Sequence, residues 1–104
     1  MHIIKCTENY VEQLAEIFEE YRLFCGFERN LAETSKFLMN LIRNEESAIF
    51  IALDIEANCV MGFVNLYPSY SSLALQRLWI LNDLGVSSKY RGKGVSKALI
   101  YKAQ

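Results

Sequence analysis

The chain has 104 residues, of which 52% are hydrophobic and 22% are charged, and its net charge at pH 7 is −1. This length fits one domain, and this apolar content excludes an intrinsically disordered protein. No apolar run approaches the ~20 residues of a membrane-spanning helix, and no signal peptide follows Met1, so we expect a cytoplasmic protein that contacts no membrane.

Cysteine and histidine content narrows the possible chemistry. The three cysteines, Cys6, Cys25 and Cys59, are widely spaced, which argues against a disulfide framework or a cysteine-rich zinc site. His2 is the single histidine, so a Ser-His-Asp or Cys-His triad is excluded. No acidic cluster has the spacing of a cation-binding loop, and we therefore expect no bound metal.

Charge is divided unevenly along the chain. Residues 1–60 hold eleven acidic and five basic side chains, whereas residues 61–104 hold one acidic side chain, Asp83, and six basic ones. The overall balance gives no sign of nucleic-acid binding, and we expect none. The basic segment is suited to attract phosphate groups. Solvated helix faces account for most of the glutamates.

Residues 2–46 predict a short strand and two helices. His2–Cys6 is mostly apolar and predicts an edge strand, after which the Thr7 hydroxyl is suited to cap a helix. Residues 8–24 predict an amphipathic helix that ends before Gly26, because apolar residues recur at helical spacing. These residues are Val11, Leu14, Ala15, Phe18 and Tyr21. Asn30 is suited to cap a second helix, with a predicted buried face of Phe37, Leu38, Leu41 and Ile42.

Residues 47–102 predict three strands and a third helix. Ser47–Leu53 predicts a strand buried on both faces, because its apolar residues do not alternate with polar ones. A turn leads into a partner strand, Cys59–Tyr67, in which Gly62 indicates a bulge or a close backbone approach. Residues 68–72 predict a loop, Leu75–Val86 a long strand and residues 95–102 a helix. The order β-α-α-β-β-β-α predicts an α+β fold with a mostly antiparallel sheet.

The turn before the third helix carries the clearest chemical signal. Gly92 and Gly94 allow backbone N–H groups to face an oxyanion, and the first helical turn adds its own unpaired N–H groups. Arg91, Lys93 and Lys97 surround this turn with positive charge. We interpret it as a phosphate-binding turn, the alternative being an ordinary glycine turn with solvated lysines. The Walker A and dinucleotide-binding patterns do not match the sequence.

The stretch Arg91-Gly92-Lys93-Gly94-Val95-Ser96 resembles the acetyl-CoA loop of the GNAT family of N-acetyltransferases, Gln/Arg-x-x-Gly-x-Gly/Ala. Ser96 departs from the usual glycine or alanine. The resemblance extends upstream through Leu81–Val86 and, in the order of elements, over the whole chain. It implies an acyl-CoA N-acyltransferase-like fold in which residues 1–104 form one partial domain, incomplete at its C-terminus. In the family, a further strand, a helix bearing a tyrosine that protonates the leaving thiolate, and two more strands follow.

The resemblance also implies roles for particular residues. Backbone groups of Leu84, Gly85 and Val86 would pair with the pantetheine arm of acetyl-CoA, the co-substrate, and the turn would hold its diphosphate. The turn residues so implied are Arg91, Gly92, Lys93, Gly94, Val95, Ser96 and Lys97. Asp83 is the candidate catalytic residue, as a base or by orienting a water molecule, the alternative being that it only binds backbone at a bulge.

The expected function is direct transfer of an acetyl group from acetyl-CoA to an amine of a small molecule or a protein. The alternative is a non-catalytic or fragmentary CoA-binding or dimerising module, since no tyrosine here matches the one that protonates the thiolate. We expect a homodimer, because a missing strand would leave one sheet edge unpaired.

Three groups of residues bear less directly on function. The glutamates of the first two helices hint at a cationic acceptor such as a polyamine. A solvated loop, or alternatively an acceptor site, is expected for Tyr67, Tyr70, Ser71 and Ser72. Core positions are expected for Phe18, Phe24, Phe37, Phe50, Phe63 and Trp79.

Overall fold

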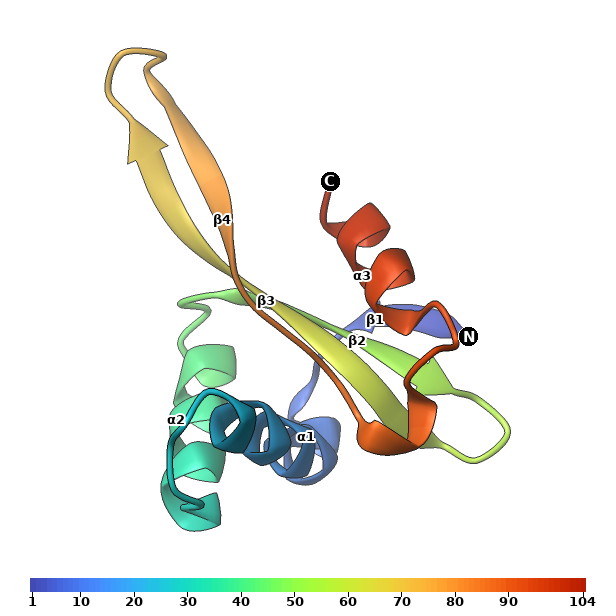
Figure 1. The fold of residues 1–104 in the computed structure, drawn as a ribbon. Helices are drawn as coiled ribbons and strands as arrows, with labels where there is room; N and C mark the ends of the chain where they lie inside the picture. Colours follow the sequence, from blue (N-terminus) through green and yellow to red (C-terminus); the bar gives the residue numbers. More distant parts are fainter.

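Four antiparallel strands form one sheet in the order β1–β2–β3–β4 in the computed structural model, which describes residues 1–104 (Figure 1). The strands are β1 (His2–Lys5), β2 (Ala48–Asp54), β3 (Cys59–Ser71) and β4 (Gln76–Val86). The helices are α1 (Val11–Phe24), α2 (Leu31–Arg43) and α3 (Val95–Ala103), with short 3₁₀ turns at Glu8–Tyr10 and Ser88–Tyr90. The predicted order of elements is confirmed, and β1 lies at a sheet edge as expected.

Helices cover both faces of the sheet. The pair α1 and α2 packs on one face and α3 on the other (Figure 1). The larger apolar cluster lies under α1 and α2 and includes the fully buried Leu14, Leu38 and Phe63. The smaller cluster joins Val64 of β3 to Leu99 of α3. Strand β2 contributes to both clusters, which confirms that it is buried on both faces.

The helix ends follow local sequence signals with one exception. The Asn30 side chain accepts a hydrogen bond of 3.3 Å from the backbone N–H of Glu33, which confirms the predicted cap of α2. Gly26 lies beyond α1 with a φ of 93°, in the left-handed region that favours glycine. The predicted Thr7 cap is wrong, because Thr7 precedes a 3₁₀ turn and its side chain makes no capping bond there.

The prediction of a loop over residues 68–72 is wrong, because β3 continues to Ser71. Pro68 pairs with Trp79 and Ser71 with Gln76, so β3 and β4 form a long hairpin that projects from the body (Figure 1). The pairing of β3 with β2 ends at Leu66. Pro68 is therefore on a strand with one free edge, where the missing N–H of a proline is tolerated.

Half of the predicted core aromatics lie outside the core. Phe18 and Phe63 are buried and Phe50 is half-buried. The prediction is wrong for Phe24, Phe37 and Trp79, whose exposed fractions are 83%, 50% and 49%. Trp79 lies on the projecting hairpin, which no helix covers, and Phe24 is the last residue of α1. Phe37 also leaves the predicted buried face of α2, where Leu38 and Leu41 are buried.

Two glycines of the sheet have no room for a side chain. The β2–β3 register shifts next to Gly62, which confirms the predicted irregularity there. A Cβ atom on Gly62 would lie 2.8 Å from the carbonyl oxygen of Gly85 and 3.0 Å from Cγ1 of Val95. A Cβ atom on Gly85 would lie 2.6 Å from Cε1 of Phe63. Any side chain at these positions would overlap atoms of the neighbouring strand, and at Gly62 also of α3.

Candidate functional site

The turn between β4 and α3 has the backbone conformation that its glycines predict. Gly92 and Gly94 have φ values of 77° and 76°, and Gly94 is the N-terminal cap of α3. An added Cβ atom would meet nothing within 4 Å at either position. Glycine is therefore needed here for conformation, and the space beside the turn is open to a ligand.

The backbone N–H groups of this turn are unpaired. None of those from Arg91 to Lys97 donates a hydrogen bond within the chain. The first bond of the helix is donated by Ala98 to the carbonyl of Gly94, at 3.1 Å. Free N–H groups at a helix N-terminus carry partial positive charge, and together they suit an anion such as a phosphate.

Full positive charges surround the same N–H groups. Arg91, Gly92, Lys93, Ser96 and Lys97 are exposed, whereas the Val95 side chain is buried against the sheet and offers only its backbone. The three ion pairs of the chain lie elsewhere, so no acidic partner neutralises these basic side chains. An anion is thus the complementary ligand.

Contacts from three directions hold the turn in place. The N–H of Ser87 donates to the carbonyl of Met61 at 2.8 Å, and the N–H of Ser88 donates to Oε1 of Glu20 at 3.1 Å. The Tyr90 hydroxyl reaches Oδ2 of Asp54 at 3.5 Å. The turn is therefore tied to β3, α1 and the end of β2.

A cavity of about 200 Å³ lies between α1 and the end of β4. Its walls are Ile17, Tyr21, Phe24, Leu84, Gly85, Val86 and Arg91. Since β4 is the last strand of the sheet, its outer backbone edge has no strand partner. The structure thus brings the predicted strand residues 84–86 and Arg91 of the predicted turn to one cavity.

Asp83 precedes these residues, and three side chains hold its carboxylate. The Tyr21 hydroxyl donates to Oδ1 at 2.9 Å, while the amides of Asn65 and Asn82 donate to Oδ2 at 2.9 and 3.0 Å. The β3–β4 register shifts between Asn65 and Leu66, so a bulge is present beside Asp83. The hydrogen bonds to the carboxylate nevertheless come from side chains rather than from backbone.

Tyr21 is a functional candidate that the sequence pattern did not single out. Burial, together with the negative charge and hydrogen bond of Asp83, raises the pKa of Tyr21 to about 12. The phenol thus stays neutral and donates to Asp83 at physiological pH. Tyr21 follows the apolar spacing of α1, and the fully buried Asn65 lies in an otherwise apolar strand, so both read as core residues in the sequence. Their polar atoms were the only sign that they hold Asp83 instead.

A second cavity, of about 260 Å³, shares Tyr21 as a wall with the first. Its walls are Phe18, Tyr21, Arg22, Cys25, Phe27 and Asp83. Because Tyr21 lines both cavities, Asp83 stands close to the boundary between them. This arrangement suits a reaction between two ligands, one in each cavity.

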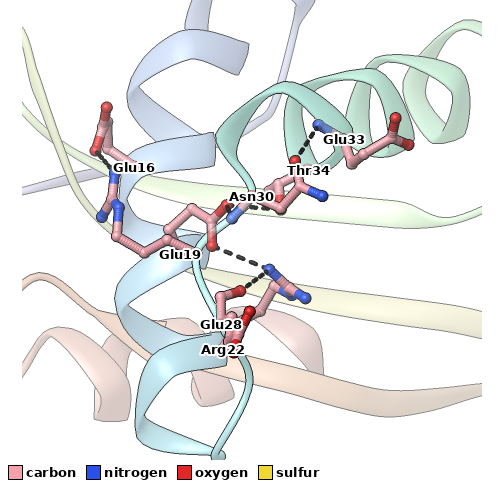
Figure 2. A network of polar contacts seen from close by, with 8 residues as sticks. Glu16, Glu19, Arg22, Glu28, Asn30, Glu33 and Thr34 are labelled. Atoms are coloured by element: carbon pink, nitrogen blue, oxygen red, sulfur yellow. Dashed lines mark hydrogen bonds and ion pairs between the residues drawn. The ribbon is translucent and has the colours of Figure 1, made fainter.

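A polar network joins α1 to the start of α2 (Figure 2), and one of its members, Arg22, lines the second cavity. Glu19 is fully buried, and its Oε1 accepts from the Asn30 N–H at 2.7 Å and from the Thr34 hydroxyl at 3.1 Å. Its Oε2 pairs with Arg22 at 3.1 Å. Burial opposes ionisation, but the hydrogen bonds and the Arg22 charge outweigh it and lower the pKa of Glu19. Glu19 is thus an exception to the solvated glutamates expected on α1.

The aromatic and hydroxyl residues of the hairpin lie apart from both cavities. Neither cavity is lined by Tyr67, Tyr70, Ser71 or Ser72. Tyr70 instead lies under the Arg77 guanidinium, which is 5.6 Å from its ring centroid. No three His, Cys, Asp or Glu side chains gather in a metal-binding arrangement, and no helix is long and apolar enough to cross a bilayer.

Comparison with known proteins points to one family. The sequence model of the acetyltransferase (GNAT) family matches residues 11–104. A probable acetyltransferase of Haemophilus influenzae is 39% identical over the whole chain, which spans 70% of that protein. An uncharacterized N-acetyltransferase of Bacillus subtilis is 35% identical, and the chain spans 68% of its length.

Solved structures show the same arrangement of elements. The crystal structure of a probable acetyltransferase superposes with a TM-score of 0.94 at 40% identity, over 99% of this chain and 68% of that one. A ribosomal-protein-alanine N-acetyltransferase from Brucella melitensis biovar Abortus gives a TM-score of 0.79 at 20% identity, over 99% and 69% of the two chains. At that identity the second likeness concerns the fold alone.

Proposed function

Because this chain belongs to the GNAT family of acetyltransferases, we propose that it transfers an acetyl group from acetyl-CoA directly to an amine of a small molecule or a protein. Family membership carries the general chemistry of acetyl transfer. The observation that supports the donor is the run of unpaired N–H groups from Arg91 to Lys97, set among uncompensated basic side chains.

The proposed donor site divides into two parts. The N–H groups of residues 91–97 hold the diphosphate of acetyl-CoA, and Arg91, Lys93 and Lys97 add charge attraction. The outer backbone edge of Leu84–Val86 pairs with the amide groups of the pantetheine arm in the manner of an added strand. The open space at Gly92 and Gly94 supports this fit, because nothing in the chain obstructs the approach of a phosphate.

In the proposed mechanism the residues between the two cavities prepare the acceptor. Asp83 takes a proton from the acceptor ammonium, directly or through a water molecule, so that the neutral amine attacks the acetyl carbonyl. Bound acetyl-CoA would supply the thioester. Its C–S bond breaks after the C–N bond forms, and the proton that the attacking nitrogen then loses would pass through water to the departing CoA thiolate. A backbone N–H of β4 polarises the carbonyl. Tyr21 orients Asp83 rather than protonating the thiolate, because a phenol with a pKa of about 12 is a weak acid.

We further propose a homodimer in the cytoplasm. The exposed Leu73, Leu75 and Trp79 of the hairpin support self-association. Three free cysteines support a reducing compartment. Light scattering across a tenfold range of concentration tests the dimer, and a monomer mass throughout would contradict it.

A thiol-release assay tests the activity. We expect acetyl-CoA plus a panel of primary amines to release free CoA thiol above the rate of hydrolysis. Thermal denaturation with and without CoA tests binding separately, since a ligand of the native state raises the melting temperature. Protection by CoA without turnover would leave the non-catalytic CoA-binding module as the function, and no protection would reject both.

A further inference from the structure

The cavity beside Asp83 is lined by three aromatic rings, those of Phe18, Tyr21 and Phe27. Phe18 stacks on Phe63 with ring centroids 5.0 Å apart and meets Tyr21 edge-on at 5.5 Å, so two of the rings are held by packing. The volume of about 260 Å³ lies just below the roughly 300–1,000 Å³ of typical ligand-binding cavities. These walls suit a small, largely aromatic molecule.

Asp83 has capacity for one more hydrogen-bond donor. A carboxylate offers about four lone-pair sites, and Asp83 uses one on Oδ1 for Tyr21 and two on Oδ2 for Asn65 and Asn82. The remaining site is on Oδ1, the oxygen that faces Tyr21. An ammonium N–H is the complementary donor for a charged carboxylate.

The second charged wall of the cavity, Arg22, is already neutralised. Its Nη1 pairs with the buried Glu19 at 3.1 Å and donates to the carbonyl of Glu28 at 2.9 Å (Figure 2). Its guanidinium also lies 5.6 Å from the ring centroid of Phe27. The uncompensated charge on the cavity wall is therefore the single negative charge of Asp83, which matches one positive charge on a ligand and repels a carboxylate.

We infer that the acceptor is a primary amine carried on a small aromatic body, with one positive charge and no carboxylate. This inference rests on the proposed acetyltransferase function. The ring occupies the cavity of Phe18, Tyr21 and Phe27, and the ammonium binds Oδ1 of Asp83. Tyr21 also lines the cavity at Leu84–Val86, so the nitrogen lies toward the expected position of the thioester. A polyamine fits less well, because Asp83 is the only acidic residue on this wall.

Calorimetry on the CoA-loaded full chain tests the inference with three probe amines. We expect phenethylamine to bind at least about tenfold more tightly than either of the other two amines. Phenylalanine carries an additional carboxylate, and spermidine has more positive charges and no aromatic ring. Phe27→Ala should weaken phenethylamine binding about fivefold to tenfold, by loss of an aromatic wall. Phe37→Ala is the matched control, because Phe37 is similarly exposed and lines neither cavity, and should leave the affinity unchanged.

The outcomes separate this inference from the proposed function. Equal or tighter binding of phenylalanine or spermidine overturns the inference and leaves acetyl transfer standing. Unchanged phenethylamine affinity in both Phe27→Ala and Asp83→Asn also overturns it, provided that CoA binds these variants normally. Failure of the wild-type chain to bind CoA rejects the proposed function, and the inference with it.

Discussion

The hydroxyl of Tyr21 donates a 2.9 Å hydrogen bond to the carboxylate of Asp83, a residue 62 positions further along the chain. This bond joins α1 to β4 at the boundary between the two cavities. It fixes one oxygen of the carboxylate while Asn65, on the neighbouring strand, fixes the other. The position of the candidate base therefore depends on three separate elements.

Replacing Tyr21 with phenylalanine should slow acetyl transfer without weakening CoA binding. Loss of the hydrogen bond frees the Asp83 carboxylate to rotate, and we expect kcat to fall by about tenfold, less than the roughly 10²–10⁴-fold that general acid–base catalysis supplies in full. Steady-state kinetics and calorimetry with CoA measure the two effects. An unchanged kcat would remove Tyr21 from the mechanism.

The same variant should alter stability at alkaline pH. Burial and Asp83 raise the pKa of Tyr21 from its usual 10 to about 12 on folding. The neutral phenol therefore contributes fully to the free energy of unfolding below pH 10, and this contribution is lost as pH rises toward 12. The wild type should therefore lose more stability over this range than Tyr21→Phe does. Buried Cys6, whose pKa rises to about 12, affects both proteins equally. Tyr101→Phe, at an exposed position, is the control and should follow the wild type in urea denaturation.

Replacing Gly94 with aspartate should weaken CoA binding by at least about tenfold, because a carboxylate would stand against the diphosphate. Gly26→Asp is the matched control. Both glycines have a positive φ and open space around the Cβ position, but only Gly94 belongs to the turn. Calorimetry with CoA should show a loss for Gly94→Asp alone. A similar affinity for both variants would remove the turn from the donor site.

Replacing Gly85 with alanine should lower the free energy of unfolding by about 1–3 kcal/mol, because the new methyl group overlaps a packed ring. The overlap is with Phe63, whose Cε1 would lie 2.6 Å from the added atom. In the Phe63→Leu background the cost of the same change should be smaller, since the ring is absent. Urea denaturation of the four proteins measures the cycle, and an equal cost in both backgrounds would show that the strain lies elsewhere.

Replacing Glu19 with glutamine should destabilise the fold by about 1–3 kcal/mol near neutral pH, because Arg22 loses its charged partner in a buried network. The pKa of Glu19 is lowered from its usual 4.5, so the contribution of its charge is complete above that pH and is lost as pH falls below it. The difference from wild type should therefore shrink in acid. Glu16→Gln, which breaks the exposed pair with Arg29, should change stability by less than about 1 kcal/mol. A difference that grew in acid would contradict the assigned role of Glu19.

Local signals were sufficient for much of the fold. The helical spacing of apolar residues predicted α1, α2 and α3, and a single side chain, Asn30, marked the start of α2. The turn at Gly92 and Gly94 was equally readable, because positive φ values and open N–H groups depend on residues adjacent in sequence. The resemblance to an acetyltransferase loop rested on these same few residues.

Burial was less predictable, because it depends on what packs against a residue. Phe18 and Phe24 are two phenylalanines of the same helix, yet Phe18 is buried and Phe24 is exposed. Trp79 is exposed because β3 and β4 extend beyond the helices as a hairpin. Pro68 is tolerated in β3 because the pairing with β2 ends at Leu66 and leaves that edge free. Composition and periodicity carry no information about where the covering layer ends.

The sequence by itself thus determined the order of the elements and the glycine-dependent conformation of one turn, since both arise from neighbours along the chain. Only the tertiary structure decided that Tyr21, Asn65 and Asp83 meet, and that a buried Glu19 neutralises the arginine of the second cavity. The contacts of Asp83 join residues of separate helices and strands, and the pairing of Glu19 with Arg22 depends on the burial of Glu19. Both features follow from how the elements pack.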